Sequence, residues 1–158
     1  MIEIKIQNDG VVELPFDRVD GVDFGGMNLH RAVFTGLNVA GSLFFESNLR
    51  NAYFDGCDMR SCDMRRAAMM NSLLKSANLQ GALMCESVLV GAVFDDADLR
   101  GADLAGADVA FASFINADAR GAKLTCKRLN EADLSGLIYD DSTVFPQGFG
   151  FSGVNSGK

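Results

Sequence analysis

The sequence is poor in the residues on which most enzyme chemistry and metal binding depend. Its 158 residues include no tryptophan, two prolines, four cysteines and a single histidine, His30. No two cysteines form a Cys-x-x-Cys pair, and with one histidine this argues against a zinc site. No nucleophile stands beside a base in a recognisable motif. We therefore expect no catalytic residues, no cofactor and no metal, and a protein that is not an enzyme.

Basic residues are also in the minority, and this bears on partners and location. Lysine and arginine number 14 against 21 acids, giving a net charge of −7 and a pI of about 4.6. Direct binding to nucleic acid or to an anionic membrane needs a basic surface, so we expect neither. The start, MIEIKI, lacks the apolar core of a secretory signal. We expect a cytoplasmic protein whose four cysteines are reduced thiols.

One stretch has few charges, and it raises the question of a membrane span. Residues 69–94, MMNSLLKSANLQGALMCESVLVGAVF, contain only Lys75 and Glu86 as charged residues. These two, with the amides of Asn71, Asn78 and Gln80, are spread through the stretch and would be costly in lipid. The stretch is therefore a poor candidate for a spanning helix.

A period of five accounts for the apolar residues, where the periods of a helix and of a strand do not. Every fifth residue from Phe24 to Tyr139 gives 24 positions, and 22 of them are Leu, Phe, Met or Val. Two residues before each of these central positions, 19 of 24 are Ala, Ser or Cys. The segment FDDADLRGADLAGADVA (94–110) shows the pattern most clearly.

Such a period predicts a square coil with five residues on each side and 20 in each turn. A helix cannot return to one face every five residues. In the coil, each side turns one large and one small residue inward, and glycines such as Gly81, Gly91 and Gly101 suit corners with unusual backbone angles. Residues 20 apart are stacked, which predicts one aromatic-rich column inside: Phe34, Phe54, Leu74, Phe94, Phe114 and Leu134.

The repeat resembles that of the pentapeptide-repeat proteins, whose consensus is A-(D/N)-L-x-x, over about three quarters of the chain. The resemblance implies an all-β fold, a right-handed quadrilateral parallel β-helix, here of about six turns. We expect three segments: an N-terminal hairpin cap (1–21), the β-helix (22–141), and a short C-terminal cap with a flexible tail (142–158).

The ends of the predicted coil carry more detailed expectations. In the hairpin, a loop of Asn8, Asp9 and Gly10 would set Ile6 opposite Val12 and Ile4 opposite Leu14. In the C-terminal cap, Val144 and Phe145 would close the last turn. Lys127 falls on an inward small-residue position, where its charge would be buried unpaired, so we expect a local bulge at 125–130 or an open last turn.

Surplus apolar residues at outward positions predict a contact surface, since contiguous exposed apolar area usually marks one. The strongest interpretation is a homodimer. Shielding of these residues by neighbouring turns, or a different partner protein, are the alternatives. The candidate interface is Val33, Tyr53, Met70, Leu73, Leu83, Val88, Val90 and Val93.

A second outward feature is acidic. Between residues 86 and 118 there are seven acids and one base, Arg100, a net of −6. The seven are Glu86, Asp95, Asp96, Asp98, Asp103, Asp108 and Asp118. Family members of the quinolone-resistance type mimic DNA toward type II topoisomerases, so the resemblance allows a DNA mimic that binds gyrase. Acid before the central residue is also the family consensus. The preferred function is a non-enzymatic, self-associating scaffold for protein contacts.

Overall fold

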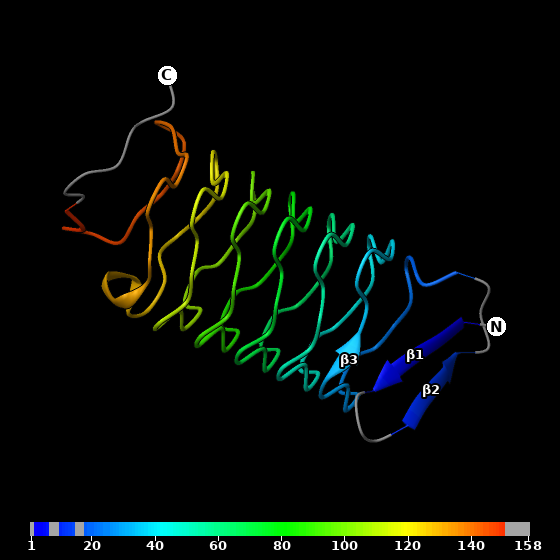
Figure 1. Cartoon of the computed structure of the whole chain (residues 1–158). Coiled ribbons are helices and arrows are strands. Elements are labelled where there is room, and N and C mark those ends of the chain that lie inside the picture. Colours follow the sequence, from blue (N-terminus) through cyan, green and yellow to red (C-terminus); the bar gives the residue numbers. More distant parts are fainter. Residues whose placement is uncertain (1, 7–9, 15–17, 151–158) are drawn as a thin grey trace.

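Parallel backbone bridges between residues 20 apart run along the chain in the computed structural model, which describes residues 2–6, 10–14 and 18–150. They begin with Asp23 and Leu43 and recur at every fifth position, so that each side of a turn is paired with the next turn. The chain is therefore an all-β solenoid, a β-helix whose turns stack into a rod (Figure 1). The period of five and the stacking interval of 20 are confirmed.

Each side of a turn is held by backbone hydrogen bonds to the turns before and after it. The Leu73 N–H donates to the Ala52 carbonyl at 2.9 Å, and the Leu73 carbonyl accepts from the Phe54 N–H at 2.7 Å. The same two bonds recur one turn later around Val93. On each side the pairing is limited to an isolated bridge, except near the N-terminal end, where two residues form the strand β3 (Ala32–Val33).

The corners depend on a left-handed backbone conformation. Every residue whose number ends in 1 or 6, from Gly21 to Gly121, has a φ between 55° and 71°. A turn hydrogen bond closes each of these corners after the first, as from the Cys57 N–H to the Phe54 carbonyl at 3.0 Å. Glycine adopts this φ without strain, which explains its recurrence at these positions and confirms the expected corner role of Gly81, Gly91 and Gly101.

The interior is a continuous column of the central residues. All of them from Phe24 to Leu129 are buried. Phe34 stacks on Phe54 with ring centroids 4.8 Å apart, and Phe94 on Phe114 at 4.9 Å, so the predicted aromatic column is confirmed. Phe44 meets both Phe34 and Phe54 edge-to-face from another side of the coil.

The small residues line the same interior and satisfy their own polar groups. The Ser47 hydroxyl donates to the Phe44 carbonyl at 2.7 Å. The thiols of Cys57 and Cys62 lie 2.7 and 3.1 Å from the carbonyls of Phe34 and Val39. Within the described part of the chain no buried side-chain nitrogen or oxygen lacks a hydrogen-bond partner.

The N-terminal hairpin forms, but in a different register. β1 (Ile2–Ile6) pairs antiparallel with β2 (Gly10–Leu14), with Ile4 opposite Val12 and Ile6 opposite Gly10. The predicted pairs were wrong by two residues, and the expected loop residues Asn8 and Asp9 lie outside the described chain. A shift of two keeps the same side chains on the same face, so the apolar alternation could not distinguish the two registers.

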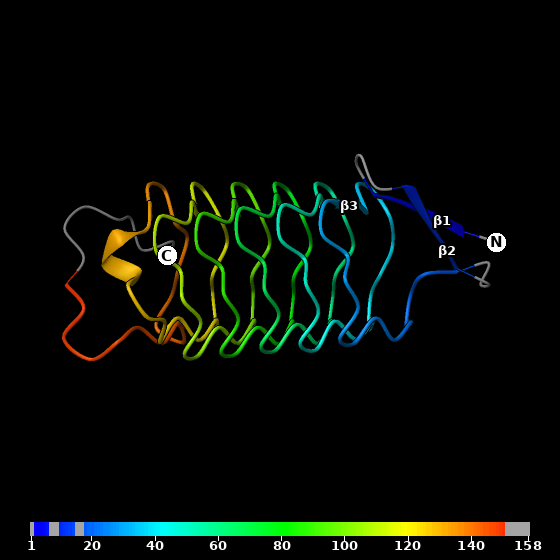
Figure 2. The ribbon, with the colours of Figure 1, turned by 90° about the horizontal axis from the view of Figure 1, so that it is seen from below.

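The hairpin is joined to the rod through β1, which pairs antiparallel with β3. Lys5 lies opposite Val33 and Ile6 opposite Ala32, giving the strand order β2-β1-β3. Ile4 is fully buried and belongs to the interior of the rod. Figure 2 shows the hairpin continuing one end of the stack of turns.

The expected irregularity at Lys127 is present, and it keeps the charge outside. Asp108 bridges Lys127, whereas the regular interval would have paired it with Arg128. Cys126 thereby takes the interior position, 8% exposed, while Lys127 is exposed. The 3-10 helix η1 (Leu129–Glu131) follows, and the regular interval returns with Ser113 and Asp133.

The C-terminal segment differs from expectation in one residue. Val144 was predicted to fill the end of the coil, but it is 48% exposed, because its bridge to Lys123 sets it on the outer side. The neighbouring Thr143 is buried in its place, and its hydroxyl donates to the Ala119 carbonyl at 2.9 Å. Phe145 packs against the core as predicted, edge-to-face with Tyr139 at 5.4 Å. Beyond Gly150 the expected tail lies outside the described residues.

Candidate functional site

The eight apolar residues of the predicted interface all lie on the outside of the rod. Leu83 is 38% exposed, and the other seven are half-buried. Their partial burial agrees with the alternative that neighbouring turns shield them in part. Their arrangement, however, is not uniform, and it separates them into groups on different sides of the coil.

Four of the eight form one unbroken column. Val33, Tyr53, Leu73 and Val93 are joined by successive parallel bridges, so each lies directly above the previous one. We call the side of the rod that carries this column the apolar face. The corner before it carries Met70 and Val90, which are also one turn apart, and Val88 lies on the adjoining side. Seven of the eight residues thus occupy the apolar face, its bordering corner or the next side.

Leu83 does not belong to this group. It is half a turn from both Leu73 and Val93, which places it on the opposite side of the rod. Two further exposed apolar residues that were not predicted share that side, Leu43 at 42% and Phe45 at 37%. The expected single wall is therefore two separate apolar areas, of which only the first is continuous.

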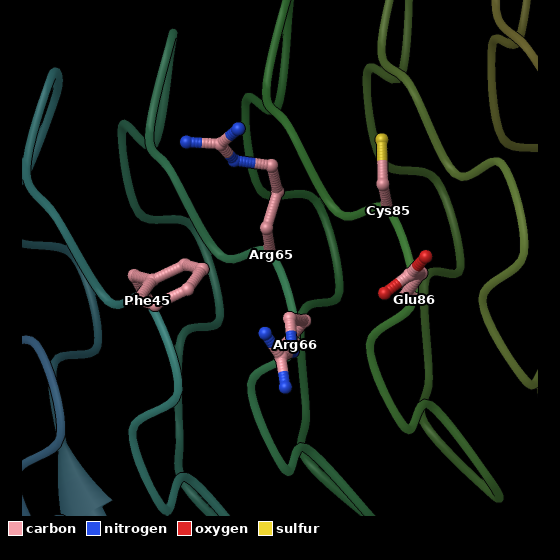
Figure 3. A pocket seen from close by; sticks show the side chains of 5 residues that line it. All are labelled: Phe45, Arg65, Arg66, Cys85 and Glu86. Atoms are coloured by element: carbon pink, nitrogen blue, oxygen red, sulfur yellow. The ribbon is translucent and has the colours of Figure 1, made fainter.

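A shallow pocket lies on this opposite side, lined by Phe45, Arg65, Arg66, Cys85 and Glu86 (Figure 3). Both guanidinium groups lie 5.9 Å from the centre of the Phe45 ring, within cation–π range. Each is already engaged, Arg65 by Asp63 at 2.6 Å and Arg66 by Glu46 at 3.1 Å. With its cations already paired, the pocket gives no specific indication of a ligand.

Phe111 was missed by the sequence argument and is the most exposed large apolar residue of those described, at 71%. It sits at the corner two residues before Ser113, on the border of the apolar face, with a φ of 58°. Positive φ is strained for a bulky side chain, and the other non-glycine residues in this conformation are all polar or charged. An aromatic at a corner position of the repeat was the sequence signal that could have found it.

The seven acids of the predicted acidic surface are dispersed around the rod. Asp98 and Asp118 share one side, whereas Asp103 and Asp108 lie on two others. Glu86, Asp95 and Asp96 fall at corners. The structure therefore does not bring them together as one negative face.

Most of these acids are also neutralised by nearby bases. Arg100 pairs with Asp98 and Arg120 with Asp118, each at 2.6 Å, while Lys123 pairs with Asp103 at 3.0 Å and Arg128 with Asp108. Three of the four bases lie beyond residue 118, outside the range that gave the net charge of −6. The stacking of turns places Lys123 and Arg128 beside their acids, and Arg120 is two residues from Asp118 in the same turn. The arginine hydrogen bonds hold the pKa of Asp98, Asp108 and Asp118 below the ordinary range.

Three of the four cysteines are buried, and the fourth, Cys85, is half-buried with a pKa that burial raises. All four thiols are free, and burial raises the pKa of Cys57 to about 11 and those of Cys62 and Cys126 to about 12. A thiol with so high a pKa is a poor nucleophile. His30 lies half-buried on the outside, with its Nε2 3.2 Å from the Asn51 amide nitrogen.

No group of three or more His, Cys, Asp or Glu side chains in residues 2–6, 10–14 and 18–150 is placed to hold a metal ion. In the same ranges no helix is both long and apolar enough to cross a membrane.

Comparison with known protein families gives one match that covers most of the rod. The model of pentapeptide repeats matches in eight copies, over residues 40–75, 72–109 and 112–138. Among curated proteins nothing matches the sequence.

Several solved structures are similar in fold. The pentapeptide repeat protein Rfr23 from the cyanobacterium Cyanothece 51142 is 22% identical, with a TM-score of 0.53, covering 81% of this chain and 87% of its own. The pentapeptide repeat protein alr5209 from Nostoc Pcc 7120 is 33% identical over 56% of this chain and 77% of its own, with a TM-score of 0.47. QnrB1, a plasmid-mediated fluoroquinolone resistance protein, is 16% identical over 88% of this chain and 85% of its own, with a TM-score of 0.45.

Proposed function

Because this chain belongs to the pentapeptide-repeat family, we propose that it works as a rigid scaffold for protein–protein contacts and associates with itself through the apolar face. The observation that carries the proposal is the unbroken outer column of Val33, Tyr53, Leu73 and Val93. These side chains are surplus to the interior, which the central residues already fill. Apolar area that the fold itself does not need is typical of a contact surface.

The size of the face predicts how strong the association is. A face roughly 29 Å long and about 12 Å wide offers roughly 350 Å², well below the ~800 Å² per partner of a standard interface. We therefore expect a reversible dimer that is populated only at high protein concentration. The stiffness of the rod helps, because little backbone has to be ordered when two such faces meet.

The double substitution Leu73→Glu/Val93→Glu is expected to abolish self-association. It places two carboxylates at the centre of the face, where they would be desolvated without a partner. Sedimentation velocity over a range of concentrations up to hundreds of micromolar would show wild type shifting toward the dimer and the variant remaining a monomer. The matched control is Leu83→Glu on the opposite side, which should leave the shift unchanged. A wild-type protein that stays monomeric throughout would exclude the proposed dimer.

The alternative that the resemblance allows, an acidic DNA mimic binding a type II topoisomerase, has less support. A DNA mimic needs a coherent negative surface, and the acids here are spread over several sides and largely paired with arginine or lysine. We expect no inhibition of gyrase supercoiling at micromolar protein. Asp95 and Asp96 form no ion pair with a described residue. If the protein inhibited gyrase and changing these two residues to asparagine removed the inhibition, that result would favour mimicry instead.

Several finer expectations belong to the same proposal, and of these only the right-handed winding rests on the resemblance alone. They are the right-handed winding, the number of about six turns, the capping role of the two end segments, the cytoplasmic location and the lack of enzymatic activity. The buried high-pKa thiols and the paired charges of the outer wall support the last of these.

A further inference from the structure

The outer column of the apolar face ends in opposite charges. At one end the pairing of β1 with β3 sets Lys5 beside Val33, on the same side of the sheet. At the other end the bridges continue from Val93 to Ser113 and Asp133. Lys5 and Asp133 are both exposed. The column thus runs from a base, through four apolar residues and a serine, to an acid.

We propose that a second copy of this chain docks on the apolar face with its rod axis antiparallel to the first. This inference rests on the proposed self-association and specifies its geometry. The column has seven positions, and Leu73 is the middle one. A two-fold axis beside Leu73 sets Tyr53 against Val93 of the second copy and Lys5 against its Asp133. Tyr53, Leu73 and Val93 then meet apolar residues, Val33 meets Ser113, and both ends form ion pairs.

A parallel arrangement of the same faces lacks this match. It would set Lys5 against Lys5 and Asp133 against Asp133, and like charges brought together across an interface oppose association. The charged ends therefore select between two arrangements that the apolar residues alone would allow. An isologous contact of this kind closes as a dimer and does not grow into a filament.

The corner that borders the face adds a second match. Its column includes Arg31, Asn71 and Phe111, with Asn71 level with Leu73 and the other two residues two turns to either side. The same axis brings Phe111 over Arg31 of the second copy, a cation–π contact. This gives a role to an exposed aromatic held in a strained backbone conformation.

The opposite border carries charges that the arrangement also accommodates. Lys75 is level with Leu73, so the two Lys75 side chains approach each other near the axis. Asp55 and Asp95 flank Lys75 one turn to either side. Each ammonium group therefore has carboxylates of both copies within reach, which offsets the repulsion between the two lysines.

Disulfide trapping tests the orientation directly, in a Cys85→Ser background because the other three native thiols are buried. Leu73→Cys lies near the axis and should cross-link in either orientation, so it reports association alone. Tyr53→Cys and Val93→Cys should cross-link only when the two variants are mixed. Cross-linking of Val93→Cys with itself would overturn the antiparallel geometry and leave the proposed dimer standing. Failure of Leu73→Cys to cross-link at any concentration would overturn both.

Charge exchange provides an independent test in solution. We expect Lys5→Glu and Asp133→Lys each to weaken the dimer about fivefold, since each turns two end contacts into like-charge contacts. The double variant restores opposite charges at both ends and should recover wild-type association, which also shows that neither change unfolds the protein. In a parallel dimer the single changes keep like charges together, so unchanged dissociation constants for both would contradict the proposal.

Discussion

Phe54→Ala is expected to destabilise the protein by about 3–5 kcal/mol, the usual cost of removing a fully buried ring. Phe54 has no exposed surface, stacks on Phe34 at 4.8 Å and meets Phe44 edge-to-face at 5.8 Å. The turns are fixed to one another by backbone hydrogen bonds, so the walls cannot close over the space that the ring leaves. For a chain of this length, thermal unfolding should occur roughly 6–20 °C lower.

The matched control is Phe111→Ala, the same substitution at a ring that is 71% exposed. Since the Phe111 side chain contributes little to the interior, its loss should change the free energy of unfolding by less than about 0.5 kcal/mol. Denaturant titration of both variants at low protein concentration, where the dimer is not populated, measures the difference. Equal losses for the two variants would mean that the central residues do not carry the stability of the rod.

Ala102→Leu is expected to cost about 1–3 kcal/mol through overpacking. Ala102 is completely buried, and the residues stacked on it in the neighbouring turns, Ala82 and Ala122, are also buried alanines. The three positions form a column that has room only for a methyl group at each level. A leucine there must displace a central residue of its own or an adjoining turn.

The control for this prediction is the next residue, Asp103→Ala, on the outer side of the same turn. It removes an ion pair with Lys123 and a hydrogen bond from the Ala105 N–H, both at 3.0 Å and partly exposed. Interactions of this kind contribute about 1 kcal/mol or less. Thermal melts of the two variants should rank Ala102→Leu clearly below Asp103→Ala, and equal melting temperatures would contradict the inward and outward assignment.

The interior could be predicted from the sequence almost residue by residue, because a strict repeat leaves one geometric solution. Once the length of a turn is known, the neighbours of Phe34 or Ala102 follow by counting. The same counting failed where the chain departs from the repeat. At Lys127 the sequence indicates an irregularity but not its form, because the repeat does not say by how many residues the chain departs from the frame before η1. The hairpin register could not be predicted because two alternatives present the same apolar face.

The outer surface was predicted less well, because its properties depend on residues that are distant in sequence. A net charge counted along residues 86–118 leaves out Lys123 and Arg128, although each lies within one turn of the acid it neutralises. Counting along the sequence also grouped Leu83 with Leu73, although half a turn separates them and they lie on opposite sides of the rod. Charges and apolar areas of a solenoid have to be summed by column, which requires knowing the turn length first.

The length of each side, one pentapeptide, also governs how such a molecule can change during evolution. Duplication of a single pentapeptide would preserve the alternation of large and small residues in the interior, although residues across the insertion would gain new stacking neighbours. It would also rotate all later outer columns by a quarter turn. The column that joins Val33 to Val93 would then be cut in two, with its halves facing different directions. Only duplications of a whole turn lengthen the rod and keep its faces aligned. The fold thus tolerates duplication of one pentapeptide, whereas the outer faces stay aligned only after duplication of a whole turn. A binding face can therefore be lost or created by an insertion that leaves the fold unharmed.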